Sequence, residues 1–405
     1  MLSIDFIRDN LDRVRECTKN KRREVDFEKL LQLDEEKRRQ LHEIEILRAE
    51  RNRISEKGKD QSEEEKQRNR DIKNKLKELE KLLQITDHEL QTILLTIPNV
   101  YIEGTPVGND ERENVELRKW GTIANFDFPI KDHIELAKLN DLVDWGRGSK
   151  VSGFRGYFLK NEAAVYQFKL LSFAFNTLTQ KGYTPLIAPA LVKEFAFFGN
   201  GQFPWGREEV YNLEKDKQYL AGTAEVPVTA YFADEVLEEK DLPKKFVAFS
   251  PCFRREAGSY GRDTKGLYRV HEFWKIEQVV ITKADTEEGL VMFDEILNNA
   301  EELLQALNMP YRVMHLCSGE MGEPQFKKYD IETWMPSRNG YGETMSCSFM
   351  TDFQARRLNI RYKTRDGKIK HAYTLNNTAI ASPRILIPIM ENNQTEGGRI
   401  NWPEI

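Results

Sequence analysis

The longest stretch of this chain with uninterrupted helical character runs from about Phe27 to Ile97. It contains Gly58 as its only glycine, no proline, and a high density of Glu, Lys and Arg, which is the composition of long helices. In its second half, apolar residues recur at alternating spacings of four and three, weakened only at Thr86: Ile72, Leu76, Leu79, Leu83, Leu90, Ile93 and Ile97. This repeat is typical of one helix in a coiled coil.

The first half of the same stretch predicts a partner helix with a less regular apolar seam, formed by Leu41, Ile44, Leu47 and Ile54. A turn is expected between Ser55 and Ser62, since Ser62 followed by three glutamates is a helix start signal. Two helices joined by a short turn must run antiparallel, so residues 28–97 are expected to form a coiled-coil hairpin.

Two interpretations of this hairpin are open: a structural or dimerising coiled coil, and an arm that binds RNA. Residues 37–81 contain 15 basic and 11 acidic side chains, a net charge of +4 in a chain whose net charge is −5. The excess is concentrated in the second helix, at Lys66, Arg68, Arg70, Lys73, Lys75, Lys77 and Lys81. A basic stripe on a rigid arm suits contacts with the phosphates of an RNA helix.

The chain as a whole has the features of a soluble, cytoplasmic protein. Its 405 residues allow two or three domains, and no run of about 18 apolar residues is present that could span a membrane. The N-terminus lacks the basic start and apolar core of a signal peptide. The four cysteines are widely separated and contain no Cys-x-x-Cys pair, so a reducing compartment is expected and no zinc site.

A linker is predicted at residues 98–111, where proline and glycine end the helical stretch. The sequence then alternates short strand candidates with isolated helices, including one at 162–180 and one at 226–236. Because repeated βαβ units are absent, we expect an α+β fold with a mainly antiparallel sheet flanked by helices. The expected domains are an N-terminal helical arm at 1–105 and a second domain at 106–405.

One polar, glycine-bearing run, from Phe253 to Glu277, separates two apolar, β-prone segments. This pattern predicts two antiparallel strands joined by a long loop with a mobile tip. A guanidinium and a carboxylate at the root of such a hairpin can bind a phosphate and a base amine together. The alternative is a solvated hairpin with scattered ion pairs.

The sequence of this run resembles motif 2 of the seryl-tRNA synthetases, a class II aminoacyl-tRNA synthetase family, in the pattern Phe-Arg-x-Glu-Ala-Gly followed by Arg-Val-His-x-Phe-x-Lys-x-Glu. The bacterial type of this family also has an N-terminal helical arm that binds tRNA, which the predicted hairpin resembles. Further stretches match the family in order: 182–189 resembles motif 1, 220–227 its Thr-Ala-Glu loop, 341–348 a metal- and ATP-contacting strand, and 374–384 motif 3. The resemblance implies a class II catalytic domain that activates L-serine with ATP and transfers it to tRNA.

The resemblance also implies roles for single residues. Arg254, Glu343 and Arg384 are the expected catalytic residues. ATP would be contacted by Arg254, Glu256, Val270, Phe273, Glu343, Thr344, Met345, Ser346 and Arg384, with Mg²⁺ on Glu343 and Ser346. Serine would be contacted by Thr223, Ala224, Glu225, Arg254, Glu277, Asn376 and Thr378. From the residues alone, Thr223 can also be a helix N-cap.

The implied partners are L-serine, tRNA(Ser) and a second copy of the chain, and the sequence leaves open whether tRNA(Sec) is charged too.

Three departures from the family pattern stand out: Asn377 in place of a usual glycine, Phe349 in place of a usual polar residue, and Ser382-Pro383. Asn377 is expected to be tolerated in a loop, because asparagine accepts left-handed backbone conformations. Two other classes are alternatives, a ligase that loads a carrier protein and a non-catalytic interaction protein. The basic arm argues against the first, and the presence of all of Arg254, Glu277, Glu343 and Arg384 against the second.

Overall fold

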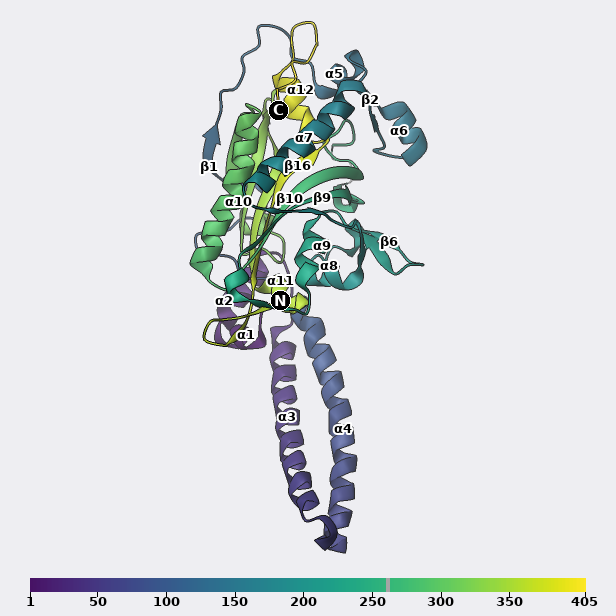
Figure 1. The fold of residues 1–405 in the computed structure, drawn as a ribbon, viewed down its shortest axis with the longest axis vertical. Coiled ribbons are helices and arrows are strands. Elements are labelled where there is room, and N and C mark those ends of the chain that lie inside the picture. Colours follow the sequence, from purple (N-terminus) through teal and green to yellow (C-terminus); the bar gives the residue numbers. More distant parts are fainter. Residues whose placement is uncertain (260–262) are drawn as a thin grey trace. The chain divides into compact units, whose positions relative to one another are not determined.

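The computed structural model describes residues 1–259 and 263–405 (Figure 1). The chain divides into two compact units, Leu2–Pro98 and Asn99–Ile405, the second of which also includes Met1. The tip of the hairpin that follows Phe253, predicted from the sequence to be mobile, lies at residues 260–262, outside the described residues. No helix within the described ranges has the combination of length and apolar character needed to cross a lipid bilayer.

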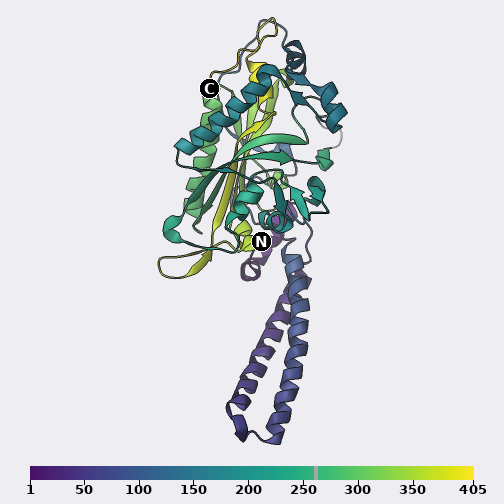
Figure 2. The ribbon, with the colours of Figure 1, turned by 45° about the vertical axis from the view of Figure 1, so that its right-hand side comes forward.

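The first unit is helical, and its two long helices confirm the predicted hairpin. Its elements are α1 (Ile4–Asp9), α2 (Leu11–Asn20), α3 (Phe27–Glu56), a 3₁₀ turn at Gly58–Asp60, and α4 (Glu63–Leu94). Figures 1 and 2 show α3 and α4 lying side by side along their length. The predicted start of α4 is also confirmed, since Ser62 and Glu65 form a capping box that satisfies two backbone N–H groups at the helix end.

The seam between α3 and α4 is apolar over most of its length, with Ile44, Leu47 and Ile54 packed against Ile72 and Leu76. One predicted member of the seam is wrong. Leu41 is 39% exposed, and its neighbour Gln40 is buried in the seam instead. Gln40 donates a hydrogen bond of 3.1 Å to the Thr86 hydroxyl, so the weak point of the apolar repeat is occupied by a paired polar contact.

The second unit is built on a large sheet, in agreement with the α+β prediction. Among the described residues this sheet has eight strands, in which only β4 and β9 are parallel neighbours. In spatial order the strands are β1 (Val115–Trp120), β11 (Tyr311–His315), β12 (Lys327–Met335), β13 (Gly340–Thr351), β16 (Tyr373–Ser382), β10 (Glu272–Thr282), β9 (Lys244–Phe253) and β4 (Thr184–Ile187). The predicted antiparallel pair around the polar loop is confirmed as β9 and β10.

Smaller sheets and helices surround this sheet. The strands are β5 (Leu191–Lys193), β7 (Gln218–Leu220) and β6 (Tyr211–Leu213); β15 (Ile369–His371), β14 (Arg361–Lys363) and β8 (Val236–Glu238); and β2 (Val143–Asp144) and β3 (Phe158–Leu159). The helices are α5 (His133–Leu139), α6 (Trp145–Ser152), α7 (Asn161–Gln180), α8 (Glu194–Asn200), α9 (Glu225–Thr229), α10 (Thr286–Ala306), α11 (Phe353–Leu358) and α12 (Leu386–Asn392).

Two of these helices can be compared with helices predicted from the sequence. The helix predicted at 162–180 is confirmed as α7. The helix predicted at 226–236 is shorter than expected, because α9 ends at Thr229 and a 3₁₀ turn, Ala230–Phe232, follows. The backbone then leaves helical geometry at Ala233 (ψ 135°) and at Asp234, whose φ is 64°, and the chain enters β8.

Helices α7 and α10 pack on one face of the main sheet. Along β10, Ile276 and Val280 belong to the core that α7 and α10 help to form, and the Gln278 amide donates to the carbonyl of Ile296 in α10. Phe273, Lys275 and Glu277 alternate with these residues and therefore point to the opposite face. That second face carries the pocket described below.

We expect the apolar seam, rather than helix propensity, to stabilise the pairing of α3 and α4. Leu76 is 3% exposed and Leu82, on the same helix, is 51% exposed. Leu76→Ala should lower the free energy of unfolding of the helical unit by roughly 2–4 kcal/mol, and Leu82→Ala by less than about 1 kcal/mol. Hydrogen exchange of α3 and α4 amides measures the difference, and equal protection in the two variants would contradict it.

Candidate active site

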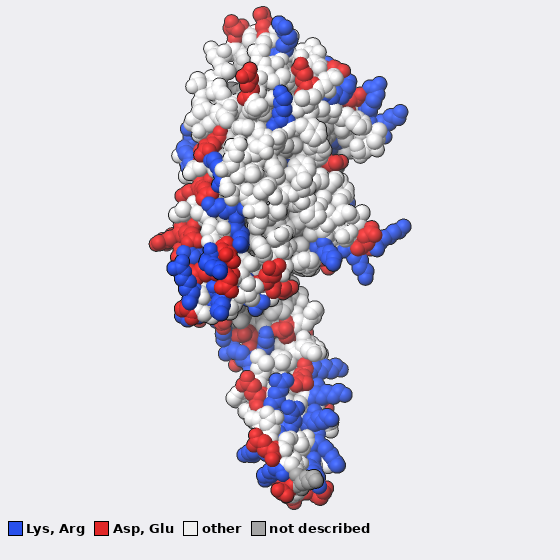
Figure 3. All heavy atoms as spheres, viewed as in Figure 1, with Lys and Arg blue, Asp and Glu red and all other residues white. Residues whose placement is uncertain are grey.

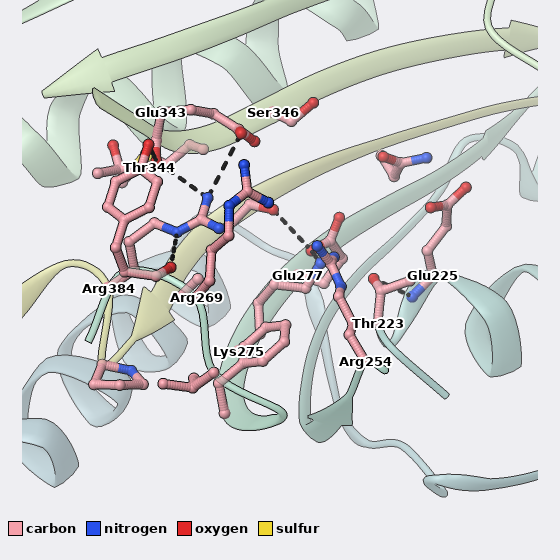
Figure 4. A pocket seen from close by; sticks show the side chains of 18 of the residues that line it. Thr223, Glu225, Arg254, Arg269, Lys275, Glu277, Glu343, Thr344, Ser346 and Arg384 are labelled. Carbon is pink, nitrogen blue, oxygen red and sulfur yellow. Dashed lines mark hydrogen bonds and ion pairs between the residues drawn. The ribbon is translucent and has the colours of Figure 1, made fainter. Parts of the chain in front are cut away.

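A cavity of about 180 Å³ opens on the face of the sheet opposite α7 and α10, and it is lined by residues of β10, β13 and β16 and by Arg254 and Glu256, which follow β9 (Figure 4). It brings together residues that lie up to 182 positions apart in the chain, from Gln202 to Arg384. The predicted site residues that line it are Thr223, Glu225, Arg254, Glu256, Val270, Phe273, Glu277, Glu343, Thr344, Met345, Ser346, Asn376, Thr378 and Arg384.

Ala224 is the exception among the predicted residues. Its side chain is fully buried in an apolar cluster with Val228, Phe246 and Val279. The side chain therefore supports the loop before α9 from behind, while the side chains of its two neighbours, Thr223 and Glu225, reach the cavity.

Two irregularities in strand pairing aim side chains into the cavity. Opposite β12, Asp330 pairs with Ser346 and Glu332 with Glu343, so β13 contains one extra residue between these pairs. Glu343 and Ser346 are three positions apart and would lie on opposite faces of a regular strand, but the extra residue turns both toward the cavity. A similar shift opposite Ile276 and Glu277 lets both Thr378 and Ala381 of β16 line the cavity.

One end of the cavity contains two carboxylates. Glu277 is 2% exposed, lies 2.7 Å from the Lys275 ammonium, and accepts a 3.2 Å hydrogen bond from the Thr378 hydroxyl. Because this buried carboxylate has a cation and a hydroxyl fixed beside it, its position is defined before any ligand enters.

Glu225 is the second carboxylate at this end, and its protein partner is neutral. The Gln354 amide of α11 donates to Glu225 at 2.8 Å and to the carbonyl of Asn200 at 2.9 Å, and it accepts from Thr374 at 2.6 Å. Burial, followed by the nearby charge of Glu277, raises the pKa of Glu225 to about 6. A cationic group on a ligand would relieve this unfavourable charge.

Between the two ends of the cavity, Arg254 and Phe273 form a cation–π pair, called the platform below. The Arg254 guanidinium lies 5.2 Å from the centre of the Phe273 ring, and its Nε donates to the carbonyl of Gly222 at 3.3 Å. Glu256 lies beside Arg269, with 3.3 Å between the Oε2 and Nη1 atoms.

The other end of the cavity is formed by Glu343 and Arg384, which face each other in Figure 4. Nη1 of Arg384 lies 3.5 Å from the Glu343 carboxylate and donates to the Glu343 carbonyl at 3.2 Å, while its Nε donates to the carbonyl of Tyr268 at 3.0 Å. Desolvation alone would raise the pKa of Glu343, but the charges of Arg384, Lys328 and Arg254 outweigh it and lower that pKa. Glu343 is therefore ionised at neutral pH.

The donors at this end fit a magnesium ion. The described residues contain no cluster of three His, Cys, Asp or Glu side chains that would enclose a metal. Mg²⁺ does not require one, since it binds one or two carboxylates together with phosphate and water oxygens. The Glu343 carboxylate and the Ser346 hydroxyl share one face, and Oδ1 of Asp330, the strand partner of Ser346, is buried with no hydrogen-bond donor among the described residues.

Several lining residues were not predicted as site residues: Gln202, Leu267, Tyr268, Arg269, Lys275, Gln325, Ser348, Ala381 and Pro383. The period-two alternation of Phe273, Lys275 and Glu277 on one strand could have identified Lys275. Gln202 and Gln325 lie in loops outside the matched motifs, and no sequence signal marked them.

The structure locates all three departures from the family pattern, and it differs from the sequence expectation at Asn377. Asn377 lies within β16 rather than in a loop, and it donates to the Ile296 carbonyl at 2.6 Å. Phe349 is fully buried against α10, where a Cβ atom on Gly289 would lie 2.3 Å from its ring. Both side chains therefore face the helical layer. Pro383 alone among the departures lines the cavity, since Ser382 hydrogen bonds to Gln167.

Comparisons with known proteins agree over the whole chain. Residues 1–101 match the family model described as the seryl-tRNA synthetase N-terminal domain, and residues 209–393 match that of the tRNA synthetase class II core domain (G, H, P, S and T). The serine–tRNA ligase of Deinococcus radiodurans is 46% identical, with 100% of this chain and 96% of that protein aligned.

Solved structures show the same similarity. The crystal structure of seryl-tRNA synthetase from Pyrococcus horikoshii complexed with ATP has a TM-score of 0.93 and 38% identity, covering 100% of this chain and 96% of that one. The cytoplasmic serine–tRNA ligase of Naegleria fowleri in complex with AMP has a TM-score of 0.88 and 31% identity, covering 98% and 93%.

The raised pKa of Glu225 predicts a pH-dependent stability. Because its folded pKa of about 6 exceeds its ordinary value, the charged carboxylate destabilises the fold above pH 6, and this effect disappears as the pH falls toward 4.5. Glu225→Gln should therefore raise the free energy of unfolding by about 1–2 kcal/mol at pH 8 and by much less at pH 5. Urea unfolding at both pH values measures this, with the exposed Glu214→Gln as control; a gain of the same size at both would refute it.

Proposed function

This chain belongs to the seryl-tRNA synthetase family, and on that basis we propose that it is a serine–tRNA ligase whose cavity binds L-serine and ATP·Mg²⁺. It forms seryl-adenylate and transfers the seryl group to the 3′ end of tRNA(Ser). The observation that carries the proposal is the convergence of Arg254, Glu277, Glu343 and Arg384 in a single cavity.

Serine is proposed to occupy the end of the cavity that holds the two carboxylates. Glu277 and Thr378 would hydrogen bond to the serine hydroxyl, and Glu225 with Thr223 would bind its ammonium group, which supplies the cation that Glu225 lacks. Asn376 lines the same end. Alanine would leave the buried Glu277 and Thr378 without a ligand partner, and such sites reject the missing hydroxyl by roughly 10⁴-fold or more.

ATP is proposed to extend from the platform of Arg254 and Phe273 to Arg384. Adenine would stack on the Phe273 ring, with Glu256 accepting from its amine, while Val270, Thr344 and Met345 complete the nucleotide site. Glu343 and Ser346 would hold Mg²⁺, whose charge offsets that of the phosphates.

The first chemical step is an in-line displacement at the α-phosphorus. The serine carboxylate oxygen forms the new bond to phosphorus, and the bond to the bridging oxygen breaks to release pyrophosphate. Arg254 contacts both the serine carboxylate and the α-phosphate and thus aligns them, and Arg384 neutralises charge on the terminal phosphate. This arrangement needs no protein nucleophile, because preorganised positive charge stabilises the transition state. The 3′-OH of the tRNA then attacks the adenylate carbonyl and releases AMP.

The helical unit is proposed to bind tRNA. Figure 3 shows Lys and Arg side chains gathered along α4. Some are paired on the arm itself, as Arg68 is with Glu50 (2.7 Å) and Lys75 with Glu43 (2.6 Å). Residues 1–105 would bind tRNA and residues 106–405 would carry out catalysis, and whether tRNA(Sec) is charged as well as tRNA(Ser) is left to the assay below.

A homodimer in the cytoplasm completes the proposal. Large apolar side chains are exposed on α7, β4 and β5, among them Phe168 (62%) and Ile187 (82%). Some of these side chains, Ile187 among them, lie in the segment that resembles motif 1. Figure 3 shows a broad face of the second unit, residues 99–405, without charged side chains. Apolar patches of this kind mark interfaces, and two-fold pairs are the commonest assembly.

Pyrophosphate exchange tests the reaction and the serine site together. Among the twenty amino acids only serine should sustain rapid exchange. Glu277→Gln should raise the KM for serine roughly 10- to 100-fold, since the serine hydroxyl then donates to a neutral amide oxygen instead of a buried charge, while the KM for ATP changes little. Glu272→Gln, on the other face of the same strand, is the matched control. Absence of serine-dependent exchange in the unmodified protein would refute the function, and an equal rise in both KM values would refute the role of Glu277.

Charge reversal on α4 tests the role of the arm. Lys73→Glu combined with Lys77→Glu should reduce charging of tRNA(Ser) about tenfold or more at moderate salt, because phosphate contacts are lost, and should leave pyrophosphate exchange within about twofold. The same reversal at the exposed Lys363 and Lys368 is the control. Normal charging by the α4 variant would exclude this face from RNA binding. Parallel assays with tRNA(Sec) decide whether it is a substrate.

A further inference from the structure

A buried histidine that does not line the cavity holds the loop that leads into β10. Nε2 of His133, at the start of α5, accepts a 3.3 Å hydrogen bond from the backbone N–H of Leu267. Nδ1 of the same ring lies 3.2 Å from the carboxylate of Glu391 in α12. Since an amide N–H can only donate, Nε2 carries no proton, and the ring proton is on Nδ1, which donates to Glu391.

The orientation of the His133 ring is determined by groups around Glu391. The Glu391 side chain is fully buried and accepts from the backbone N–H of His133 at 3.0 Å and from the N–H and hydroxyl of Ser337 at 3.0 and 2.9 Å. A carboxylate with this many donors has one favoured position, so the tautomer and plane of the ring are fixed as well.

The loop approaches the ring more closely than most residues would allow. Gly266 has φ +79°, and a Cβ atom at this position would lie 2.1 Å from Nε2 of His133. Glycine is therefore required both by the backbone conformation and by the contact. The ring and the loop thus meet at one defined place.

The anchored residue lies one position before a residue that holds Arg384. Leu267, Tyr268, Arg269 and Val270 all line the cavity. The Tyr268 carbonyl accepts from Nε of Arg384 at 3.0 Å, and the Arg384 guanidinium lies 4.6 Å from the centre of the Tyr268 ring. A shift of Leu267 would move Tyr268 and with it the guanidinium of Arg384.

We propose that His133 is a positioning residue for the triphosphate end of ATP, acting through Leu267 and Tyr268 on Arg384. The inference rests on the proposed function, because it takes Arg384 as the group that binds the terminal phosphate. The proposed role predicts different effects on the affinities for ATP and for AMP. ATP reaches Arg384, whereas AMP carries no γ-phosphate and does not depend on the orientation of that side chain.

His133→Asn tests the inference, since the shorter amide can still donate to Glu391 but does not reach Leu267. Calorimetric titration should show ATP affinity reduced about tenfold, the effect of one lost hydrogen bond, and AMP affinity within about twofold of the unmodified protein. The KM for serine, measured by pyrophosphate exchange at saturating ATP, should also stay within about twofold. His133→Gln, whose carbonyl can reach the Leu267 N–H, should restore much of the ATP affinity. His315→Asn, at a histidine of β11 that does not line the cavity, is the control and should change neither affinity.

Gly266→Ala is a second, independent variant, at the point where the loop contacts the His133 ring. It replaces His133→Asn in the experiment if that variant does not fold. The added methyl group pushes the loop away from the ring and should also lower ATP affinity relative to AMP. An unchanged ratio of ATP to AMP affinity in either folded variant would overturn the inference, as would an equal loss for both nucleotides. Absence of serine-dependent exchange in the unmodified protein would instead count against the proposed function.

Discussion

The alternation of side chains along the central strands is the constraint on which the site depends. In β10, every second residue enters the core beneath α7 and α10, and the residues between them, Phe273, Lys275 and Glu277, are left for the other face. The helices that bury one face of the sheet therefore also determine which side chains are available for a ligand. A shift of one residue in the pairing of β10 with β9 would bury the charges and expose the apolar side chains.

Three carboxylates of the cavity differ in whether the protein provides a cationic partner for them. Glu277 is paired with Lys275, and Glu343 faces Arg384. Glu225 has a neutral partner in Gln354 and a pKa raised by burial. The unfavourable state of Glu225 is consistent with a site that becomes electrically balanced only when an ammonium group arrives.

Much of the site could be predicted because its members lie in short motifs with a fixed order. The sequence interpretation named Arg254, Glu277, Glu343 and Arg384 without any spatial information, and these side chains line one cavity. It placed Ala224 with them because that residue lies inside a motif, whereas the side chain packs in the core. It gave no role to Lys275, although the residue is part of the quoted pattern, and it could not indicate His133, whose contact with Leu267 spans 134 positions.

The sequence by itself determined the kinds of element and their order. The heptad repeat and the Ser62 cap specify α4, and the glycine- and proline-free composition before Gly58 specifies α3. The polar run between two apolar segments specifies the β9–β10 hairpin, because all of these are consequences of local composition, periodicity and capping. Only the tertiary structure decided which side chains meet. The extra residue in β13 that turns Glu343 and Ser346 to one face, the burial of Gln40 in place of Leu41, and the anchoring of Leu267 by His133 all depend on the strand or helix that lies opposite. Such pairings are set by packing between distant segments, which no local pattern encodes.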